Sequence, residues 1–213
     1  MVIETRWADG QVARLPALMT EVVERKVDVL VTYGTSAAVA ATSVTSTIPI
    51  VDAGMADPLA SGIITSLAHP GGNLTGLSLA WAGGMTRKRL ELLHETLPRL
   101  SSVAMIASSD DPKVIREMAK ELEAIAPTRR IKAQLIEVRD PEALDRAFKQ
   151  ARREAQAFLV PGGLFMYEHR REVTALAAKY KLPAIYPQRE YVDSGGLMAY
   201  GADIGILFRR AAD

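Results

Sequence analysis

Short apolar segments alternate along the chain with longer amphipathic ones. The apolar segments are rich in Val, Ile and Leu and lack strict polar alternation, which is typical of parallel strands covered on both faces. The segments between them repeat apolar residues every three or four positions, as a helix with one buried face does. The pattern predicts an α/β protein with strands at residues 27–33, 48–53, 73–79, 102–108, 131–138, 157–161, 183–187 and 196–200.

Several predicted strands end in a cluster of Gly, Ser, Thr or Asp residues that opens the next helix. A helix N-terminus presents unpaired N–H groups and the positive end of the helix dipole, so each junction is suited to bind a carboxylate or a phosphate. The pattern therefore predicts a protein that binds a ligand at its strand ends. Three helix starts carry an N-cap carboxylate before proline, at Asp57-Pro58, Asp111-Pro112 and Asp140-Pro141.

The pattern breaks near residues 79–84, and a new run of strand–helix units begins at Ser101. The last predicted strand leads into a helix from about Asp203, which is expected to return the chain to the first lobe. Two such crossings form a hinge. We therefore expect two doubly wound parallel-sheet lobes joined by a hinge, with lobe 1 at residues 1–80 and 196–213 and lobe 2 at residues 81–195.

Composition excludes several classes of function. The 213 residues include no cysteine and carry a formal net charge of +1. Thiol catalysis, disulfides and Cys-based zinc sites are therefore excluded, and the charge gives no reason to expect nucleic acid as a partner. No apolar run approaches the roughly 18 residues of a membrane span, and residues 1–20 lack the pattern of a signal peptide.

Motifs for catalysis and cofactor binding are also missing. His69, His94 and His169 lack the close spacing of a metal site. Fingerprints for dinucleotides and for the P-loop are absent, and neither Ser102 nor Ser194 stands in a nucleophile elbow. We expect no metal, no cofactor and no catalysed reaction.

Polar residues at three predicted strand ends are the first candidates for a ligand site. Thr35 and Ser36 follow Gly34 at the start of an alanine-rich helix, where their hydroxyls can hold a carboxylate or act as an ordinary N-cap. Asp57 follows the next strand, and a carboxylate beside hydroxyls suits the zwitterion of an amino acid. Ser108 and Ser109 form a similar cluster in the second lobe, or a simple polar loop.

Aromatic residues and one methionine fall at or just past predicted strand ends, where open α/β sheets bind their ligands. Some are expected to pack in the core or hinge, and the rest to stack on an apolar ligand body. They are Tyr33, Trp81, Phe165, Met166, Tyr186 and Tyr200.

Longer blocks of the chain resemble the ABC-transporter substrate-binding protein family, in the branch that contains tryptophan- and aromatic-amino-acid-binding lipoproteins. The most specific block is Pro-Gly-Gly-Asn-Leu-Thr-Gly at residues 70–76, and the resemblance covers essentially the whole chain. Further matching blocks lie at residues 27–38, 47–51, 56–58, 88–93, 182–186 and 195–201.

The resemblance implies a type I periplasmic-binding-protein fold whose two lobes close on a small solute and present it to a membrane permease. It implies binding without catalysis, and a periplasmic or lipid-anchored extracytoplasmic location. By resemblance, Thr35 and Ser36 bind the solute carboxylate and Asp57 lies beside them. Ser78 marks the strand that leaves the first lobe, and Ser108 and Ser109 face the solute from the second.

The chain departs from the family pattern in two places. Gly162-Gly163 stands where many relatives carry an acidic or amide residue that can pair with the solute amine, and this departure argues against an amino acid as the solute. The expected solute is therefore a small carboxylate or an amino-acid-like compound. Residues 1–7 correspond to the usual second strand, so lobe 1 is expected to lack its first strand and helix. The sheet edge exposed in this way can drive dimerisation.

Two other functions fit the same architecture. A cytoplasmic small-molecule sensor or regulatory domain is the alternative to a transport component. An enzyme is disfavoured because the motifs that it would need are missing.

Overall fold

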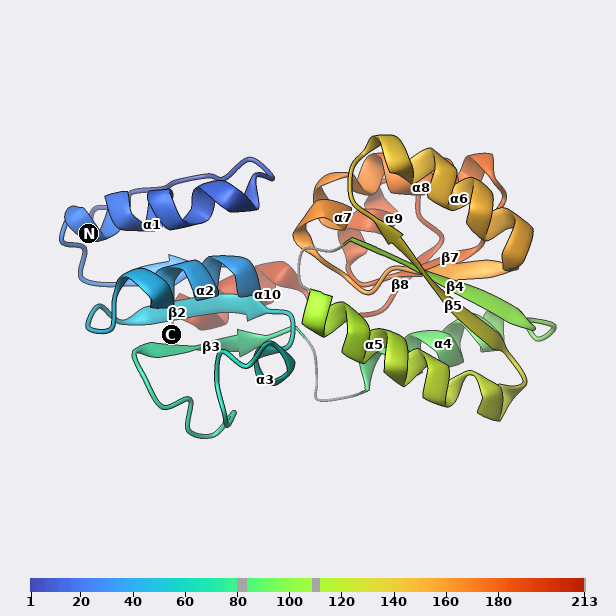
Figure 1. The fold of residues 1–213 in the computed structure, drawn as a ribbon, viewed down its shortest axis with the longest axis horizontal. Helices are drawn as coiled ribbons and strands as arrows, with labels where there is room; N and C mark the ends of the chain where they lie inside the picture. The colour runs from blue at the N-terminus through green and yellow to red at the C-terminus, as the bar shows by residue number, and fades with distance from the viewer. Residues whose placement is uncertain (80–83, 109–111, 213) are drawn as a thin grey trace. The chain divides into compact units, whose positions relative to one another are not determined.

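The computed structural model describes residues 1–79, 84–108 and 112–212 (Figure 1). The chain divides into two compact units: unit 1 comprises Met1–Leu79 and the residues from Ile204 onward, and unit 2 comprises Ala80–Asp203. The structure contains all eight predicted strands, and every pair of neighbouring strands is parallel. The α/β class expected from the sequence pattern is therefore confirmed.

Unit 1 is built on a sheet of three strands in the order β1-β2-β3. The strands are β1 (Leu30–Thr32), β2 (Ile50–Met55) and β3 (Leu74–Ser78), and the helical segments are η1 (Val12–Arg14), α1 (Leu15–Glu24), α2 (Thr35–Val44), α3 (Pro58–Ser61) and α10 (Ile204–Ala212).

The core of unit 1 lies between this sheet and its helices. Leu30, Ile50 and Leu74, one from each strand, are buried together with residues of α2. Helix α10 packs against β2 and β3, and α1 packs on α2 (Figure 1). Long-range packing of this kind, rather than helix propensity, holds the short alanine-rich helix α2 in place.

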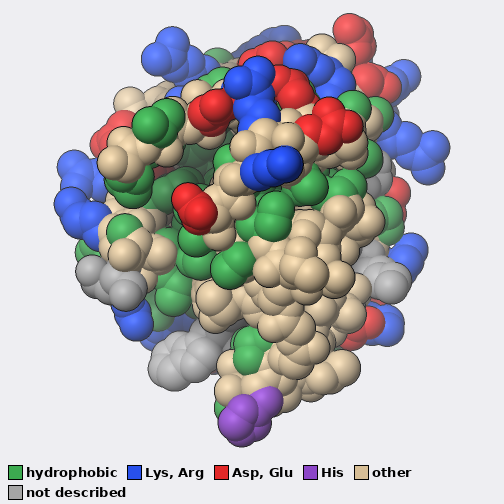
Figure 2. Space-filling model, turned by 90° about the vertical axis from the view of Figure 1, so that its left-hand side faces the viewer, with side chains coloured by type: hydrophobic (Ala, Val, Ile, Leu, Met, Phe, Trp, Pro, Cys, Tyr) green, Lys and Arg blue, Asp and Glu red, His purple; other side chains and the backbone are tan. Residues whose placement is uncertain are grey.

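One edge of the unit 1 sheet is open within the described chain. β1 is an edge strand, and the side chain of Val31 at its centre is 62% exposed. Residues 1–8, whose first seven were aligned with a strand of the family, form no strand. Figure 2 views the side of unit 1 that lies at the left of Figure 1 and shows hydrophobic side chains gathered in a hollow on the surface.

Unit 2 contains a sheet of five strands in the order β5-β4-β6-β7-β8. The strands are β4 (Ser102–Ser108), β5 (Lys132–Val138), β6 (Ala157–Leu159), β7 (Ala184–Tyr186) and β8 (Met198–Ala199), and the helical segments are α4 (Met85–Thr96), α5 (Pro112–Ile125), η2 (Pro127–Arg129), α6 (Glu142–Glu154), α7 (Leu164–Glu168), α8 (Arg170–Lys179) and α9 (Arg189–Asp193).

Helices cover both faces of the unit 2 sheet. Helices α4 and α5 bury their apolar sides in one cluster with Val103 and Met105 of β4. Helices α6 and α8 bury theirs in a second cluster with Ala104 and Ile106, the alternate residues of the same strand (Figure 1). Because the chain passes from β4 to β5 on one side and then to β6 on the other, the carboxyl ends of β4 and β6 flank a topological switch point.

The last strand lies in a different unit from the one expected. Residues 196–203 were assigned to lobe 1, but β8 pairs with β7, and the Tyr200 N–H donates to the Tyr186 carbonyl at 2.9 Å. These backbone bonds place the segment in unit 2, and the chain passes to unit 1 only after Asp203. β8 has only two residues, so its apolar pattern is too short to indicate which neighbouring strand it pairs with.

Two of the three predicted Asp-Pro helix starts can be compared with the structure. Asp57 Oδ1 accepts the Leu59 N–H at 3.1 Å, and Asp140 Oδ1 accepts the Ala143 N–H at 2.8 Å, as N-capping carboxylates do. Asp111 lies outside the described residues. In the part of the chain that the structure describes, no helix combines the length and apolar character needed to cross a membrane.

Candidate functional site

The carboxyl ends of the three unit 1 strands bring four predicted site residues to one edge. Thr35 and Ser36 open α2 after β1, Asp57 follows β2, and Ser78 ends β3. Two of them meet at Ala56: Thr35 Oγ1 accepts the Ala56 N–H at 3.1 Å, and Ser78 Oγ lies 3.5 Å from the Ala56 carbonyl oxygen. The junctions recognised in the sequence therefore form one continuous polar edge of the sheet.

The two hydroxyls at the start of α2 have different surroundings. Thr35 is 6% exposed, and its oxygen is engaged by Ala56. Ser36 is partly exposed, and its hydroxyl makes no hydrogen bond within the described chain. Gly34 precedes them with φ of 93°, a conformation that favours glycine, and no side chain caps the helix. Ser36 and the first N–H groups of α2 are therefore the groups best placed to meet an anion.

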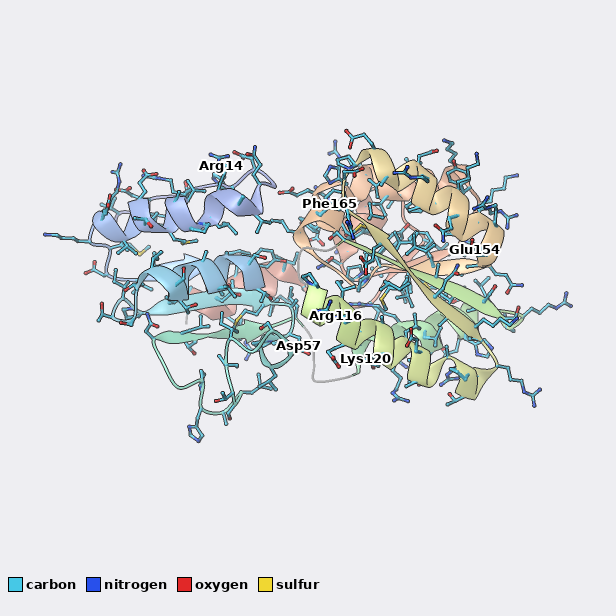
Figure 3. All side chains as sticks on the ribbon, viewed as in Figure 1. Arg14, Asp57, Arg116, Lys120, Glu154 and Phe165 are labelled. Atoms are coloured by element: carbon cyan, nitrogen blue, oxygen red, sulfur yellow. The ribbon has the colours of Figure 1, made fainter. Side chains whose placement is uncertain are left out.

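Asp57 stands beside this junction as the N-cap of α3 (Figure 3). It is partly exposed, and Oδ1 is held by the Leu59 N–H. The N-cap role is confirmed, and the role in solute binding stays a prediction.

A buried carboxylate that the sequence did not single out lies beneath the same edge. Asp52 on β2 is fully buried and accepts hydrogen bonds from Thr32 Oγ1 at 2.7 Å and from the Gly54 N–H at 2.8 Å. The Gly34 backbone also donates to it. Burial raises the pKa of Asp52, and these three donors oppose that rise. Asp52 thus ties the turn before α2 to the central strand.

Gly76 on β3 is required by this arrangement. It pairs with Asp52 in the sheet, and a Cβ at this position would collide with the Asp52 carbonyl oxygen. Its φ of 150° also disfavours other residues. The last glycine of the block at residues 70–76 therefore has a packing role directly behind the candidate site.

In unit 2, the predicted residues lie at the carboxyl edge of its own sheet. Ser108 ends β4 and is 3% exposed, and Ser109 lies outside the described residues. Gly162 and Gly163, with φ of 130° and 104°, follow β6 and open α7. Ser108 and the Gly162–Gly163 turn thus flank the switch point of this sheet.

Tyr186, the remaining predicted residue, is fully buried. Its ring stacks on Tyr191 with centroids 4.9 Å apart and meets Phe158 edge-on at 5.9 Å. The hydroxyls of Tyr186 and Tyr191 are buried without a hydrogen-bond partner, and burial raises the pKa of both. In this structure Tyr186 packs in the core of unit 2, and its role in solute binding stays a prediction.

The other residues predicted to lie at strand ends take varied positions. Tyr33 packs against Phe208 of α10 with centroids 5.3 Å apart, and Phe165 lies 4.4 Å from the His169 ring. Met166 is buried in the core, Tyr200 is 40% exposed, and Trp81 lies outside the described residues.

Arg89 is a second functional candidate that the sequence did not single out. It lies on α4 with only 4% exposure, and its guanidinium donates to the carbonyl oxygens of Tyr200 and Pro161. Inside the matching block at residues 88–93, nothing distinguishes it from an exposed basic residue of an amphipathic helix. Only the structure shows that the Arg89 side chain is buried and bound to backbone carbonyl groups.

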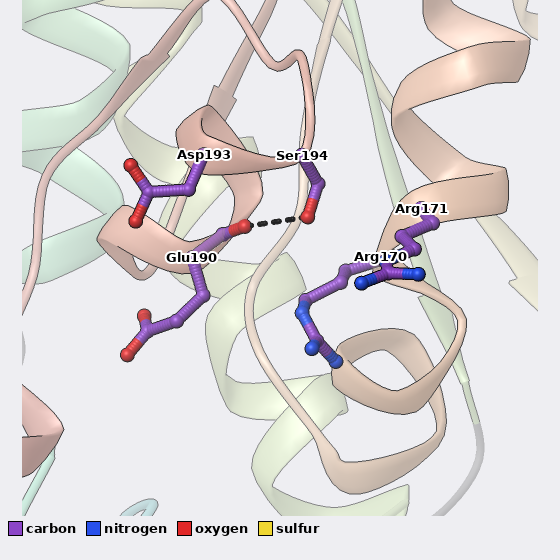
Figure 4. A pocket seen from close by; sticks show the side chains of 5 residues that line it. All are labelled: Arg170, Arg171, Glu190, Asp193 and Ser194. Carbon is purple, nitrogen blue, oxygen red and sulfur yellow. Dashed lines mark hydrogen bonds between the residues drawn. The ribbon is translucent and has the colours of Figure 1, made fainter.

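A shallow pocket on unit 2 is lined by side chains of both charges. Arg170 and Arg171 on α8 face Glu190 and Asp193 on α9, so both charges are present, and Ser194 Oγ already donates to the Glu190 carbonyl at 2.7 Å (Figure 4). None of the predicted site residues lines this pocket. Across the described residues, no group of three or more His, Asp or Glu side chains is arranged to hold a metal ion.

Known proteins resemble this chain over nearly its whole length. A tyrosine-binding protein of Clostridioides difficile is 23% identical over 211 residues, covering 99% of this chain and 60% of its own length. A Streptococcus pneumoniae ABC domain solved with L-Trp superimposes with a TM-score of 0.88 at 21% identity, covering 97% of this chain and 70% of its own. A conserved domain protein of Vibrio cholerae superimposes with a TM-score of 0.85 at 24% identity. The match covers 98% of this chain and 69% of the Vibrio cholerae chain.

These likenesses confirm the expected fold class, that of type I periplasmic binding proteins. The chain spans 60% of the length of the tyrosine-binding protein. A family model described as "ABC transporter substrate binding protein" matches residues 2–207. The chain therefore belongs to the ABC transporter substrate-binding protein family.

Proposed function

We propose that the chain binds an amino acid or a similar small carboxylate and delivers it to the membrane permease of an ABC importer. The observation that carries this proposal is the gathering of Ser36, Thr35, Asp57 and Ser78 at one sheet edge in a member of a substrate-binding family. Family membership favours a transport component over a cytoplasmic regulatory domain.

The solute carboxylate is assigned to the start of α2. Unpaired N–H groups at a helix N-terminus attract anions, and the Ser36 hydroxyl adds a donor beside them. Asp57 stands at the neighbouring strand end, where its carboxylate suits an ammonium group. In this proposal Ser108, Ser109 and Tyr186 contribute from unit 2 when the two lobes close on the solute.

Aromatic amino acids are the first solutes to test. One relative is described as a tyrosine-binding protein, and another was solved with L-Trp. Gly162 and Gly163 supply no side chain to pair with a solute amine. The proposal therefore includes aromatic carboxylates without an amine.

The proposed location is extracytoplasmic, either periplasmic or lipid-anchored, as the family resemblance implies. The open edge of β1 is a surface through which two copies of the chain can pair. Sedimentation of the purified chain tests this pairing, because a monomer at high micromolar concentration contradicts it.

The solute assignment is tested by thermal unfolding with four matched compounds. L-Trp carries both charged groups, tryptamine lacks the carboxylate, indole-3-propionate lacks the amine, and L-Leu lacks the aromatic ring. A ligand at 100 times its Kd stabilises the folded state by about 2.7 kcal/mol. We expect stabilisation by L-Trp and none by tryptamine. No stabilisation by any amino acid or organic acid contradicts the proposal.

A further inference from the structure

Arg89 is a buried cation held by backbone carbonyl groups. Its Nε donates to the Tyr200 carbonyl at 2.9 Å, and its Nη1 donates to the Pro161 carbonyl at 3.1 Å. No carboxylate of the described chain forms an ion pair with it. Burial lowers the pKa of the guanidinium to about 10, which leaves it charged at neutral pH. A buried charge without a direct ion pair is costly, so its presence calls for a reason other than stability.

The two carbonyl groups belong to segments far apart in sequence that meet at the carboxyl edge of the unit 2 sheet. Pro161 comes directly before Gly162 and Gly163, whose positive φ angles set the turn into α7. Tyr200 follows β8, and its N–H donates to the Tyr186 carbonyl. The next residue, Gly201, has no room for a side chain because a Cβ would collide with the Pro187 carbonyl oxygen. The backbone conformation of both segments is therefore closely constrained.

In the sequence, Arg89 and its partner Tyr200 each lie within about ten residues of a point where the chain passes between the units. Helix α4 begins at Met85, shortly after the chain enters unit 2 at Ala80. Tyr200 stands shortly before the chain leaves unit 2 after Asp203. Within unit 2, Arg89 therefore connects the start of α4 and the outgoing segment to the Gly162–Gly163 turn.

We propose that Arg89 is a positioning residue that holds the Gly162–Gly163 turn and the Tyr200 segment in one rigid arrangement, so that a solute contacting the turn also acts on the segment through which the chain leaves unit 2. The planar fork of arginine can donate to two carbonyl groups in different directions, whereas the lysine ammonium is a compact charge on a flexible stem. The rigid arrangement is a property of unit 2 alone. Its effect on solute binding rests on the function proposed above.

The local part of the proposal is tested by amide hydrogen exchange without any ligand. The informative amides are those of Val160 and Tyr200, which donate to the carbonyls of Ile185 and Tyr186. In Arg89→Gln we expect both to exchange roughly tenfold faster or more, since a hydrogen bond from a charged group is lost at each segment. The amides of the β4–β5 ladder are expected to keep their wild-type rates.

Two further variants sharpen this test. Arg87→Gln removes an exposed arginine from the same helix and is expected to change nothing. Arg89→Lys keeps the positive charge but not the fork, so both amides are again expected to exchange faster. The proposal is overturned if Arg89→Lys restores wild-type exchange, because charge alone is then sufficient. It is also overturned if Arg89→Gln accelerates exchange in the β4–β5 ladder by the same factor, because Arg89 then only stabilises the unit as a whole.

The solute part is tested by energy transfer between dyes on the two units. Because the chain has no cysteine, Ala17→Cys on α1 and Arg153→Cys on α6 provide two unique and exposed labelling sites. With L-Trp as the probe, we expect the labelled parent protein to change its transfer efficiency and Arg89→Gln to lose at least tenfold in affinity.

The two possible failures give different results. If neither L-Trp nor the other three compounds bind the parent protein, the proposed function fails, and the exchange data still decide whether Arg89 rigidifies unit 2. If the parent and Arg89→Gln bind L-Trp equally and change transfer equally, the proposed effect of Arg89 on solute binding is wrong.

Discussion

Thr32 and Asp52 are joined by a hydrogen bond of 2.7 Å between Oγ1 and Oδ2 in the interior of unit 1. The bond links the end of β1 to the central strand directly behind the residues proposed to bind the solute. The Asp52 carboxylate accepts hydrogen bonds but forms no ion pair with a described residue, and burial raises its pKa. Unit 1 therefore gives up some stability at neutral pH to keep this link.

This cost predicts a pH dependence that Asp52→Asn removes. Because the pKa of Asp52 is higher in the folded than in the unfolded chain, the folded state binds the proton more tightly. The free energy of unfolding thus falls as pH rises from the unfolded pKa, about 3.9, through the folded pKa. We expect Asp52→Asn to gain stability relative to wild type across that window, as measured by urea unfolding from pH 3.5 to 7. If the unfolding free energies of wild type and Asp52→Asn change with pH in parallel, the pKa of Asp52 is not raised by folding.

Substitutions at Thr35 and Ser36 are expected to affect different properties: the first lowers the stability of the fold, and the second lowers the affinity for the solute. Thr35→Val leaves the Ala56 N–H without its acceptor and should cost about 1–2 kcal/mol of unfolding free energy. Ser36→Ala removes a hydroxyl without a partner in the described chain, so stability should change by less than about 0.5 kcal/mol. Urea unfolding measures both.

Affinity for L-Trp completes this comparison. We expect Ser36→Ala to weaken binding about tenfold, which corresponds to about 1.4 kcal/mol. Wild-type affinity in Ser36→Ala would remove this hydroxyl from the proposed carboxylate site.

Gly76 and Gly72 provide a matched pair in one sequence block. Gly76→Ala drives a Cβ into the Asp52 carbonyl oxygen and should cost about 3 kcal/mol or more through strain. Gly72→Ala meets nothing within 4 Å and should stay within about 0.5 kcal/mol of wild type. Equal unfolding midpoints for the two variants would show that β3 moves aside without cost.

Tyr186 and Tyr180 should respond oppositely to loss of their hydroxyls. The Tyr186 hydroxyl is buried without a partner, so Tyr186→Phe is expected to hold or raise stability by up to about 1 kcal/mol. The Tyr180 hydroxyl donates to Asp145 at 3.0 Å, so Tyr180→Phe is expected to lose stability. Calorimetry measures both changes. A fall in L-Trp affinity in Tyr186→Phe would assign this hydroxyl to the solute.

Much of the fold could be predicted because strand-forming information is local. A parallel strand buried on both faces needs a continuous apolar run, and all eight runs became strands. The assignment of residues 196–203 differed from the structure because the pairing of β8 with β7 depends on backbone bonds between segments about a dozen residues apart. No local pattern specifies that choice.

The sequence by itself determined the polar junctions that supply Thr35, Ser36, Asp57 and Ser78, because helix starts and turns need particular residue types at particular positions. Only the tertiary structure decided that Asp52 and Arg89 are buried, since a charged side chain in an apolar strand or an amphipathic helix has the same local pattern whether it meets water or protein. Their burial depends on neighbours brought from distant parts of the chain. Thr32 and Gly54 donate hydrogen bonds to Asp52, and the carbonyl groups of Pro161 and Tyr200 accept hydrogen bonds from Arg89.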